Sequence, residues 1–332
     1  MVRIAVDESM VAEVHDFMPH SGKQIGFLER RFAVGELCRK GQLVWDRPLN
    51  TPPSSDIWQA LYFSGLVEHY PEDGTDVYEC GVVVGAPKNL VHAFKAALPK
   101  HVTGDVEILL PKRKSRKFRV PRIVVVPECA AHALAFGRNR HCIVISIGLG
   151  TVELGAATGS GVLPNSLHSI NYGLHRVAIE FRNQLRAIGF DNPEVRDDQY
   201  HYWDRILQRI MDKDDNLVLN FNGNTWEWKD LINVATEVLI SYAEKLCQQI
   251  RPYFTRFDEK MPVVFAGGGT IYEPLAERLM KLMNDMKFTG TIAKKEASII
   301  SAATGYKRIA RQVFGKKGIG IDIGNNTTIT LV

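Results

Sequence analysis

The chain has 332 residues, which is more than one hydrophobic core usually serves, so two domains or lobes are expected. Its 45% apolar and 23% charged residues are typical of a globular protein and exclude a fibrous or wholly disordered chain. No apolar run approaches the ~20 residues that cross a bilayer, and the first residues lack a charged-then-apolar leader. We expect a cytoplasmic protein that does not span a membrane.

The cysteines and the basic residues limit the other classes. Five cysteines lie far apart in no Cys-x-x-Cys spacing, so buried free thiols are expected in place of disulfides or structural zinc. The net charge of +4 is too small to indicate nucleic acid binding. Seven basic residues and no acidic one lie between Lys112 and Arg122. This segment is either a solvated hairpin or a contact for an acidic neighbour subunit, a DNA-bound adaptor or an anionic membrane surface.

Strand-like and helix-like segments alternate along the first half of the chain. Short strand-like runs that alternate with turns predict strands at residues 2–6, 32–35 and 81–84. Apolar, β-branched runs bounded by Gly or Pro predict buried strands at 122–126 and 142–147. Helical spacing predicts helices over residues 57–68 and 89–98.

The middle of the chain is helical, and the alternation returns after Pro262. Helices are predicted over residues 174–188 and 228–253, with a polar, aromatic-rich stretch at 191–226 between them. That stretch favours packing or a subunit interface over a stacking surface for single-stranded nucleic acid, because no basic residues interleave its aromatics. Later segments are predicted as strands at 263–266, 291–293 and from Ile319, and as helices at 273–284 and 297–311. Two strand–helix blocks around a helical insertion predict a two-lobed α/β protein.

Three glycine-rich segments share one pattern, in which a short apolar strand is followed by glycines with Thr or Ser. They lie at residues 143–155, 263–275 and 319–332. Glycines let backbone N–H groups approach phosphate oxygens, and hydroxyl groups add donors. Each segment alone is more often a tight turn, and none has the Walker lysine or the dinucleotide Gly-x-Gly-x-x-Gly pattern. Two similar hairpins together with a strand–Gly-Gly-Gly–helix element favour polyphosphate binding.

These segments resemble motifs of the actin, heat-shock chaperone and sugar kinase ATPase superfamily, and within it those of the bacterial actins. Ile321-Asp-Ile-Gly-Asn-Asn-Thr-Thr is similar to the first phosphate hairpin, and Ile145-Ser-Ile-Gly-Leu-Gly-Thr-Val-Glu is similar to the second. Phe265-Ala-Gly-Gly-Gly-Thr resembles the adenosine motif. Residues 126–133 and 297–306 resemble the two connecting helices, and 32–36 and 82–87 resemble segments of plasmid-segregating and shape-determining actins.

The resemblance implies a two-lobed actin-like ATPase fold with ribonuclease H-like mixed sheets and with Mg-ATP bound between the lobes. Lobe I would comprise residues 1–140, with a small subdomain around 30–70, 100–120 or both. Lobe II would comprise 141–296, with a helical insertion at about 191–230. Residues 297–332 would return to lobe I and carry the first phosphate hairpin.

The chain departs from the family pattern at two points. The first phosphate hairpin opens the family's chains but closes this one, so we expect a circularly permuted order with Gly315-Lys-Lys-Gly318 as the join. The acidic residue of the second hairpin is Ser146 here. This change is expected to weaken metal binding or hydrolysis and to leave Asp322 as the main carboxylate on the metal side.

The resemblance assigns a role to each candidate site residue. Asp322 would hold Mg²⁺ through water, or it is a strand-end carboxylate that caps the turn. Glu128 would orient the attacking water, or it is a carboxylate that the helix dipole stabilises. The expected nucleotide-binding residues are Gly148, Leu149, Gly150, Thr151, Gly173, Gly267, Gly268, Gly269, Thr270, Gly324, Asn325, Asn326 and Thr327.

An ATPase that assembles with itself head-to-tail into cytoskeletal filaments is the expected function, with hydrolysis driving disassembly. Its task would be DNA segregation, cell shape or organelle positioning, without direct sequence-specific nucleic acid binding. A soluble small-molecule kinase and a nucleotide-dependent scaffold that does not hydrolyse are the alternatives, since this fold does not determine function. A chaperone would need a peptide-binding domain after the ATPase core, and an iron–sulfur ATPase would need clustered cysteines.

Overall fold

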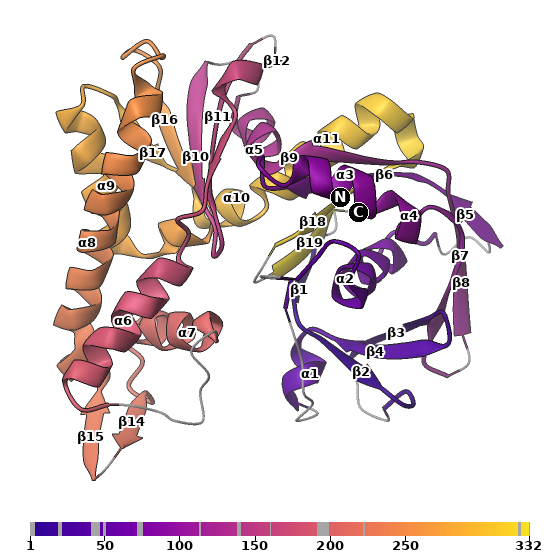
Figure 1. Ribbon diagram of the computed structural model, residues 1–332, viewed down its shortest axis with the longest axis horizontal. Coiled ribbons are helices and arrows are strands. Elements are labelled where there is room, and N and C mark those ends of the chain that lie inside the picture. Colours follow the sequence, from indigo (N-terminus) through magenta and orange to yellow (C-terminus); the bar gives the residue numbers. More distant parts are fainter. Residues whose placement is uncertain are drawn as a thin grey trace. The chain divides into compact units, whose positions relative to one another are not determined.

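The computed structural model describes residues 4–18, 22–40, 47–48, 51–71, 76–112, 114–137, 141–159, 161–190, 199–221, 223–324 and 327–331. The chain divides into two compact units (Figure 1). Unit 1 comprises Met1–Arg138, Ser160–Val162 and Ile300–Val332, and unit 2 comprises Asn139–Gly159 and Leu163–Ile299.

A five-stranded mixed sheet forms the centre of unit 1. Its order is β1 (Ile4–Glu8), β19 (Thr327–Leu331), β18 (Gly318–Ile323), β6 (Gly81–Ala86) and β9 (Ile123–Pro127). The pairs β1–β19 and β19–β18 are antiparallel, and β18–β6 and β6–β9 are parallel. The central parallel strand, β6, is buried on both faces, which explains its continuous apolar run.

Helices pack on both faces of this sheet. They are α2 (Asp56–Val67), α3 (Val91–Ala97), α5 (Glu128–Phe136) and α11 (Ser301–Phe314). Val82 and Val84 belong to the buried cluster that contains α2 and α3 side chains. Val83 points to the other face, where it joins Ala131 of α5 and Tyr306 of α11. The alternation along β6 thus separates two hydrophobic layers.

A second sheet in unit 1 has six strands. Their order is β2 (Val11–Val14), β4 (Arg30–Val34), β3 (Lys23–Phe27), β7 (Gly104–Leu110), β8 (Lys114–Val120) and β5 (Val77–Glu79). The short helices α1 (Glu36–Lys40) and α4 (Pro99–Val102) follow β4 and α3 along the chain. The basic segment predicted from the sequence forms β8, in which Phe118 and Val120 are buried and Lys117 and Arg119 are exposed.

The central sheet of unit 2 has the same pairing pattern as that of unit 1. Its order is β13 (His168–Ile170), β11 (Val152–Thr158), β10 (Cys142–Ile147), β16 (Val263–Ala266) and β17 (Gly290–Ile292). The pairs β13–β11 and β11–β10 are antiparallel, and β10–β16 and β16–β17 are parallel. The sheet has a sixth strand, the two-residue β12 (Gly161–Val162), which also pairs with β11.

The two central sheets differ in where the chain enters them. In unit 2 the chain runs through β10, β11 and β13 before it reaches β16 and β17. In unit 1 the corresponding strands are β18, β19 and β1, followed by β6 and β9. The chain therefore enters this sheet at its third strand and ends in its second, and Ile4 pairs with Leu331.

Long helices enclose the core of unit 2. They are α6 (His175–Ala187), α7 (Tyr200–Met211), α8 (Trp228–Phe254) and α9 (Glu273–Asp285). The predicted aromatic-rich stretch contains α7 and the hairpin of β14 (Val218–Phe221) and β15 (Asn224–Glu227). Trp203 of α7 is fully buried and its ring packs against Phe190. This placement is that of a core residue.

Most predicted elements are found within a few residues of their expected positions, and two are divided. The helix predicted over residues 297–311 consists of α10 (Lys295–Ile299) and α11, because the two halves belong to different units. The strand predicted from Ile319 is the β18–β19 hairpin.

The expected state of the cysteines is confirmed, since all five are buried thiols and none of them forms a disulfide. Among the described helices, none combines the length and the apolar character that a membrane span requires.

The β1–β19 pairing predicts that the chain tolerates a different order. A variant whose residues 315–332 precede Met1 would close β19 and β1 into a hairpin with a four-residue loop, Val332 and Met1 to Arg3. The new ends would lie at Gly315, an exposed residue after α11. We expect cooperative urea unfolding with a free energy within about 1 kcal/mol of the parent chain. A non-cooperative transition would show that the present order is required for folding.

Candidate functional site

The turn between β10 and β11 in unit 2 is fixed by hydrogen bonds on both sides. The N–H of Gly148 donates to the carbonyl oxygen of Thr151 at 2.9 Å, which closes a two-residue loop. The carbonyl oxygens of Gly148, Leu149 and Gly150 accept the backbone N–H groups of Leu174, His175 and Gly173, at 2.9, 2.8 and 3.3 Å. The first turn of α6 therefore holds the carbonyl side of this hairpin.

Gly173 lies against the hairpin so closely that no side chain fits. A Cβ atom there would lie 2.4 Å from the carbonyl oxygen of Leu149. The next residue but one, His175, donates its Nδ1 proton to the same oxygen at 2.9 Å. Burial lowers the pKa of His175, so the ring is neutral at pH 7. The sequence prediction included Gly173 but not His175, which carries no motif of its own.

The glycine-rich turn after β16 packs on the end of β10. Gly267 has φ of +85°, and a Cβ atom on it would lie 2.5 Å from the carbonyl oxygen of Ile147. The 3-10 turn η2 (Gly268–Ile271) follows. The hydroxyl groups of Thr270 and Ser298 donate to the Gly267 carbonyl oxygen at 2.8 and 3.1 Å. The Thr270 hydroxyl thus stabilises the turn itself.

Tyr272 anchors this turn to α7. Its side chain is 1% exposed, and its hydroxyl donates to Asp204 Oδ1 at 2.5 Å. Burial raises the pKa of Tyr272, so the phenol keeps its proton. Unit 2 therefore brings together, as one rigid set, the predicted residues Gly148, Leu149, Gly150, Thr151, Gly173, Gly267, Gly268, Gly269 and Thr270.

The turn between β18 and β19 in unit 1 is closed by the same hydrogen bond as the hairpin in unit 2. The N–H of Gly324 donates to the carbonyl oxygen of Thr327 at 2.9 Å, as Gly148 does to Thr151. Asn325 and Asn326, which were predicted to bind phosphate, lie outside the described residues. The same Gly-x-x-Thr closure thus occurs in both central sheets.

The two predicted carboxylates of unit 1 lie at one edge of its central sheet. Asp322 is near the carboxyl end of β18, and Glu128 follows the carboxyl end of β9. These strands are parallel with β6 between them, so β18 and β9 are two strand spacings apart, roughly 10 Å, and Glu128 lies two residues beyond the level of Asp322. Burial raises the pKa of Asp322 to about 7, although the residue retains partial solvent exposure.

Glu128 begins α5 in the position where a helix dipole stabilises a carboxylate. One turn later, His132 is buried with its Nδ1 atom 2.8 Å from Ser301 Oγ of α11. Burial lowers the pKa of His132 to about 4. Because the His132 ring is neutral and both His132 and Cys129 are buried, we interpret both residues as packing groups.

The structure adds one carboxylate that the sequence prediction missed. Ser146 lies directly opposite Glu153 in the β10–β11 register, so both side chains share one face of the sheet. Glu153 is 2% exposed and accepts a hydrogen bond from Ser169 Oγ at 2.5 Å. In the equivalent rung of unit 1 the acid, Asp322, is on the first strand and Ile329 is opposite. Glu153 lies two residues after Thr151, and this spacing is the sequence signal that could have indicated Glu153.

Part of the charge between Lys112 and Arg122 is matched inside the second sheet of unit 1. Arg119 Nε lies 2.8 Å from Asp105 Oδ1, and Glu107 is opposite Lys117 in the β7–β8 register. The guanidinium group of Arg116 stacks on Tyr70 at 4.7 Å from the ring centre. A contact between this segment and an adaptor or acidic partner stays a prediction.

Comparisons of the sequence with protein-family models and with curated proteins give no match. Solved structures do match. The archaeal actin homolog Ta0583 is 14% identical with a TM-score of 0.69, over 94% of this chain and 100% of that chain. A 15-stranded ParM filament from Clostridium botulinum is 14% identical with a TM-score of 0.67, over 92% of each chain. An AlfA filament bound to AMPPNP is 16% identical with a TM-score of 0.52, over 92% and 89%. The chain therefore has the actin-like fold.

Proposed function

We propose that this protein binds Mg-ATP and assembles head-to-tail into filaments that hydrolysis disassembles. The observation that carries the proposal is the repetition of the Gly-x-x-Thr hairpin in both central sheets, together with the Gly267–Thr270 turn. Structures similar in fold include filaments, and some of them are complexes with ADP, ATP or AMPPNP. Filament growth fits a head-to-tail contact that does not close into a ring.

The hairpins would bind the phosphates through backbone amides. In unit 2 the hairpin carbonyls are already bound by α6, so the groups left for an anion are the amides on the other side and the hydroxyl of Thr151. Thr327 would contribute its hydroxyl in the same way from unit 1, and Gly324 would close the turn through its N–H. Gly267 and Gly269 bring this turn close against Ile147, and Gly268 has open space where a side chain would stand, so a base and ribose would fit against Gly268.

The described residues fit a magnesium ion that keeps most of its water. They contain no group of three or more His, Cys, Asp or Glu side chains that would enclose a metal. A single carboxylate suits Mg²⁺ bound largely through water and nucleotide phosphates. Asp322 would be that carboxylate, because it lies near the end of β18 beside the Gly324–Thr327 turn. Burial raises its pKa to about 7, and a nearby cation would reverse the shift. The ion would supply charge neutralisation.

Two carboxylates are available to orient the attacking water. Glu128 stands at the N-terminus of α5, and Glu153 lies on the hairpin of unit 2. Phosphoryl transfer depends mainly on such positioning and on charge neutralisation. Glu153 supplies the carboxylate that Ser146 lacks, which favours hydrolysis over a non-hydrolysing scaffold.

The order of the strands suggests that the chain is a circular permutation of the actin-like order. The two central sheets share one topology, and only that of unit 1 is entered at its third strand. Gly315–Lys317 would be the join between the permuted segments.

Light scattering and phosphate release, recorded together after Mg-ATP is added to micromolar protein, test the proposed function. We expect scattering to rise above a critical concentration and phosphate release to follow it.

Asp322→Ala should abolish hydrolysis while circular dichroism shows an intact fold, and Glu128→Ala should lengthen filament lifetime by slowing turnover. Phosphate release without assembly would instead indicate a soluble phosphotransferase, and wild-type turnover in Asp322→Ala would refute the metal assignment.

The raised pKa of Asp322 also predicts that the stability of the nucleotide-free protein depends on pH. The folded chain holds this proton up to about pH 7, whereas an unfolded aspartate releases it near pH 4. Stability contributed by this group is therefore present at about pH 4 and is lost as the pH rises to about 7. Asp322→Asn should raise the free energy of unfolding at pH 8 by roughly 2 kcal/mol, less than the full shift because the residue is partly exposed. Urea unfolding at pH 5 and 8 measures this, and exposed Asp285→Asn is the control.

The position of Glu153 opposite Ser146 predicts what happens when the carboxylate is moved from one of these positions to the other. Glu153→Gln should slow ATP hydrolysis by roughly 100-fold while ATP affinity stays within about threefold. Adding Ser146→Asp to this variant returns an acid to the same rung of the ladder and should restore turnover. Single-turnover assays separate binding from hydrolysis. Unchanged turnover in Glu153→Gln would exclude this residue from the reaction.

A further inference from the structure

The turn between β3 and β4 exposes an apolar side chain under backbone strain. Leu28 and Glu29 form the turn with φ values of +48° and +63°. Such two-residue turns favour Asn-Gly, and leucine rarely adopts this conformation. Leu28 is also 81% exposed, more than any other large apolar side chain among the described residues. Neither feature stabilises the monomer, which points to a contact with another molecule.

The base of this hairpin holds the turn rigidly. The rings of Phe27 and Phe32 stack at 4.9 Å, and Phe27 also meets Phe63 edge to face at 4.8 Å. Arg30 forms ion pairs with Glu13 and Asp56. We call Leu28 and Glu29 the Leu28 tip. Because its base is packed and paired, the tip is pre-organised for binding.

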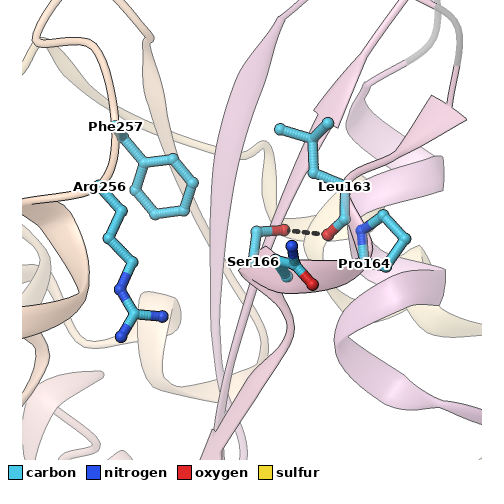
Figure 2. Close-up of a pocket in the computed structure, with 6 residues that line it drawn as sticks. Leu163, Pro164, Ser166, Arg256 and Phe257 are labelled. Atoms are coloured by element: carbon cyan, nitrogen blue, oxygen red, sulfur yellow. Dashed lines mark hydrogen bonds between the residues drawn. The ribbon is translucent and has the colours of Figure 1, made fainter.

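Unit 2 has an open pocket whose chemistry complements the Leu28 tip (Figure 2). The pocket has a volume of about 570 Å³, and we call it the Arg256 pocket. It is lined by Leu163, Pro164, Asn165, Ser166, Arg256 and Phe257.

Figure 2 shows Arg256 and Phe257 on one side of the pocket and the segment around Pro164 on the other. That segment is fixed by Ser166, whose hydroxyl donates to the Leu163 carbonyl oxygen at 2.6 Å and accepts the Ala156 N–H at 2.8 Å. Leu163 itself is 37% exposed. The pocket is thus a preformed apolar site with one cationic group.

The charges of the two surfaces are opposite. Glu29 is exposed beside Leu28, and Arg256 is exposed beside Phe257. Within the described parts of the chain, neither residue has an ion pair. A leucine entering the apolar side of the Arg256 pocket would bring the adjacent glutamate toward the guanidinium group.

We propose that the Leu28 tip of one copy of this chain docks into the Arg256 pocket of the next copy. The contact joins two different surfaces, so each copy retains a free tip and a free pocket, and repetition gives an open chain of subunits. This inference rests on the proposed assembly and identifies a contact that builds it. A small amphiphilic anion is the other ligand class that the pocket could take.

Charge reversal tests the docking even if a single variant is destabilised, because the double variant gives the decisive comparison. Glu29→Arg and Arg256→Glu should each raise the critical concentration for Mg-ATP assembly by roughly 3-fold to 10-fold, and the double variant should restore it. Restoration cannot arise from misfolding. If the two effects simply add in the double variant, the two residues do not meet.

Leu28→Gly separates the contact from the stability of the monomer. Glycine accepts positive φ, so this variant should unfold at an unchanged or higher urea concentration than the parent. Its critical concentration should nevertheless rise roughly 10-fold to 100-fold, because the buried leucine is lost. Unchanged assembly would overturn the proposal.

Disulfide cross-linking gives a readout that does not depend on filaments. Leu28→Cys protein mixed with Phe257→Cys protein should form a mixed dimer on mild oxidation, since the five native cysteines are buried. Val313→Cys, at a residue 46% exposed on α11, replaces Leu28→Cys in the control and should not react.

Assembly of the parent without the mixed dimer would refute the docking and leave the filament proposal intact. The mixed dimer without assembly would support the docking and refute the filament. An anion such as a fatty acid that binds the pocket while cross-linking is absent would identify the other ligand class.

Discussion

One backbone hydrogen bond, from the glycine N–H to the threonine carbonyl oxygen of a Gly-x-x-Thr turn, determines the form of the glycine-rich hairpin in each of the two units. It closes the turn at Gly148–Thr151 and again at Gly324–Thr327, at 2.9 Å in each. The closure turns each hairpin tightly at the end of a buried strand. Around the first of these turns, α6 binds the carbonyl groups and the Gly267 turn packs on the preceding strand. The remaining parts of the site follow from this arrangement.

Much of the fold could be predicted from the sequence because local patterns carry it. The strands at Cys142–Ile147 and Val263–Ala266 are apolar, β-branched and followed by glycine, and they lie where they were expected. The glycine-rich segments were likewise evident, because close backbone approach requires glycine at Gly173 and Gly267. Helix α7 lies within the helical insertion expected at about 191–230, but its bounds were not predicted because its sequence is rich in polar-tipped aromatics such as Trp203. The break at Ile300 was missed because it depends on which unit each half of the helix joins.

The cross-strand position of Glu153 shows what a motif alone leaves out. Considered as a linear pattern, the second hairpin lacks its acidic residue at Ser146. In the sheet, however, Glu153 occupies the same rung and face, so the carboxylate is present on the other strand. A ladder register is a long-range property that depends on the turn that sets it. The same limit applies to the Leu28 tip, since neither its exposure nor its positive φ values can be derived from the sequence around it.

The proposed function requires both hairpins to bind one nucleotide, and hydrogen–deuterium exchange with and without Mg-AMPPNP tests this requirement most directly. Peptides that contain Gly148–Thr151, Gly267–Thr270 and Gly324–Thr327 should all become protected at the same nucleotide concentration, because one ligand orders all three turns. Peptides from the β7–β8 hairpin should not change. Protection of one hairpin without the other, or of neither, would contradict the account.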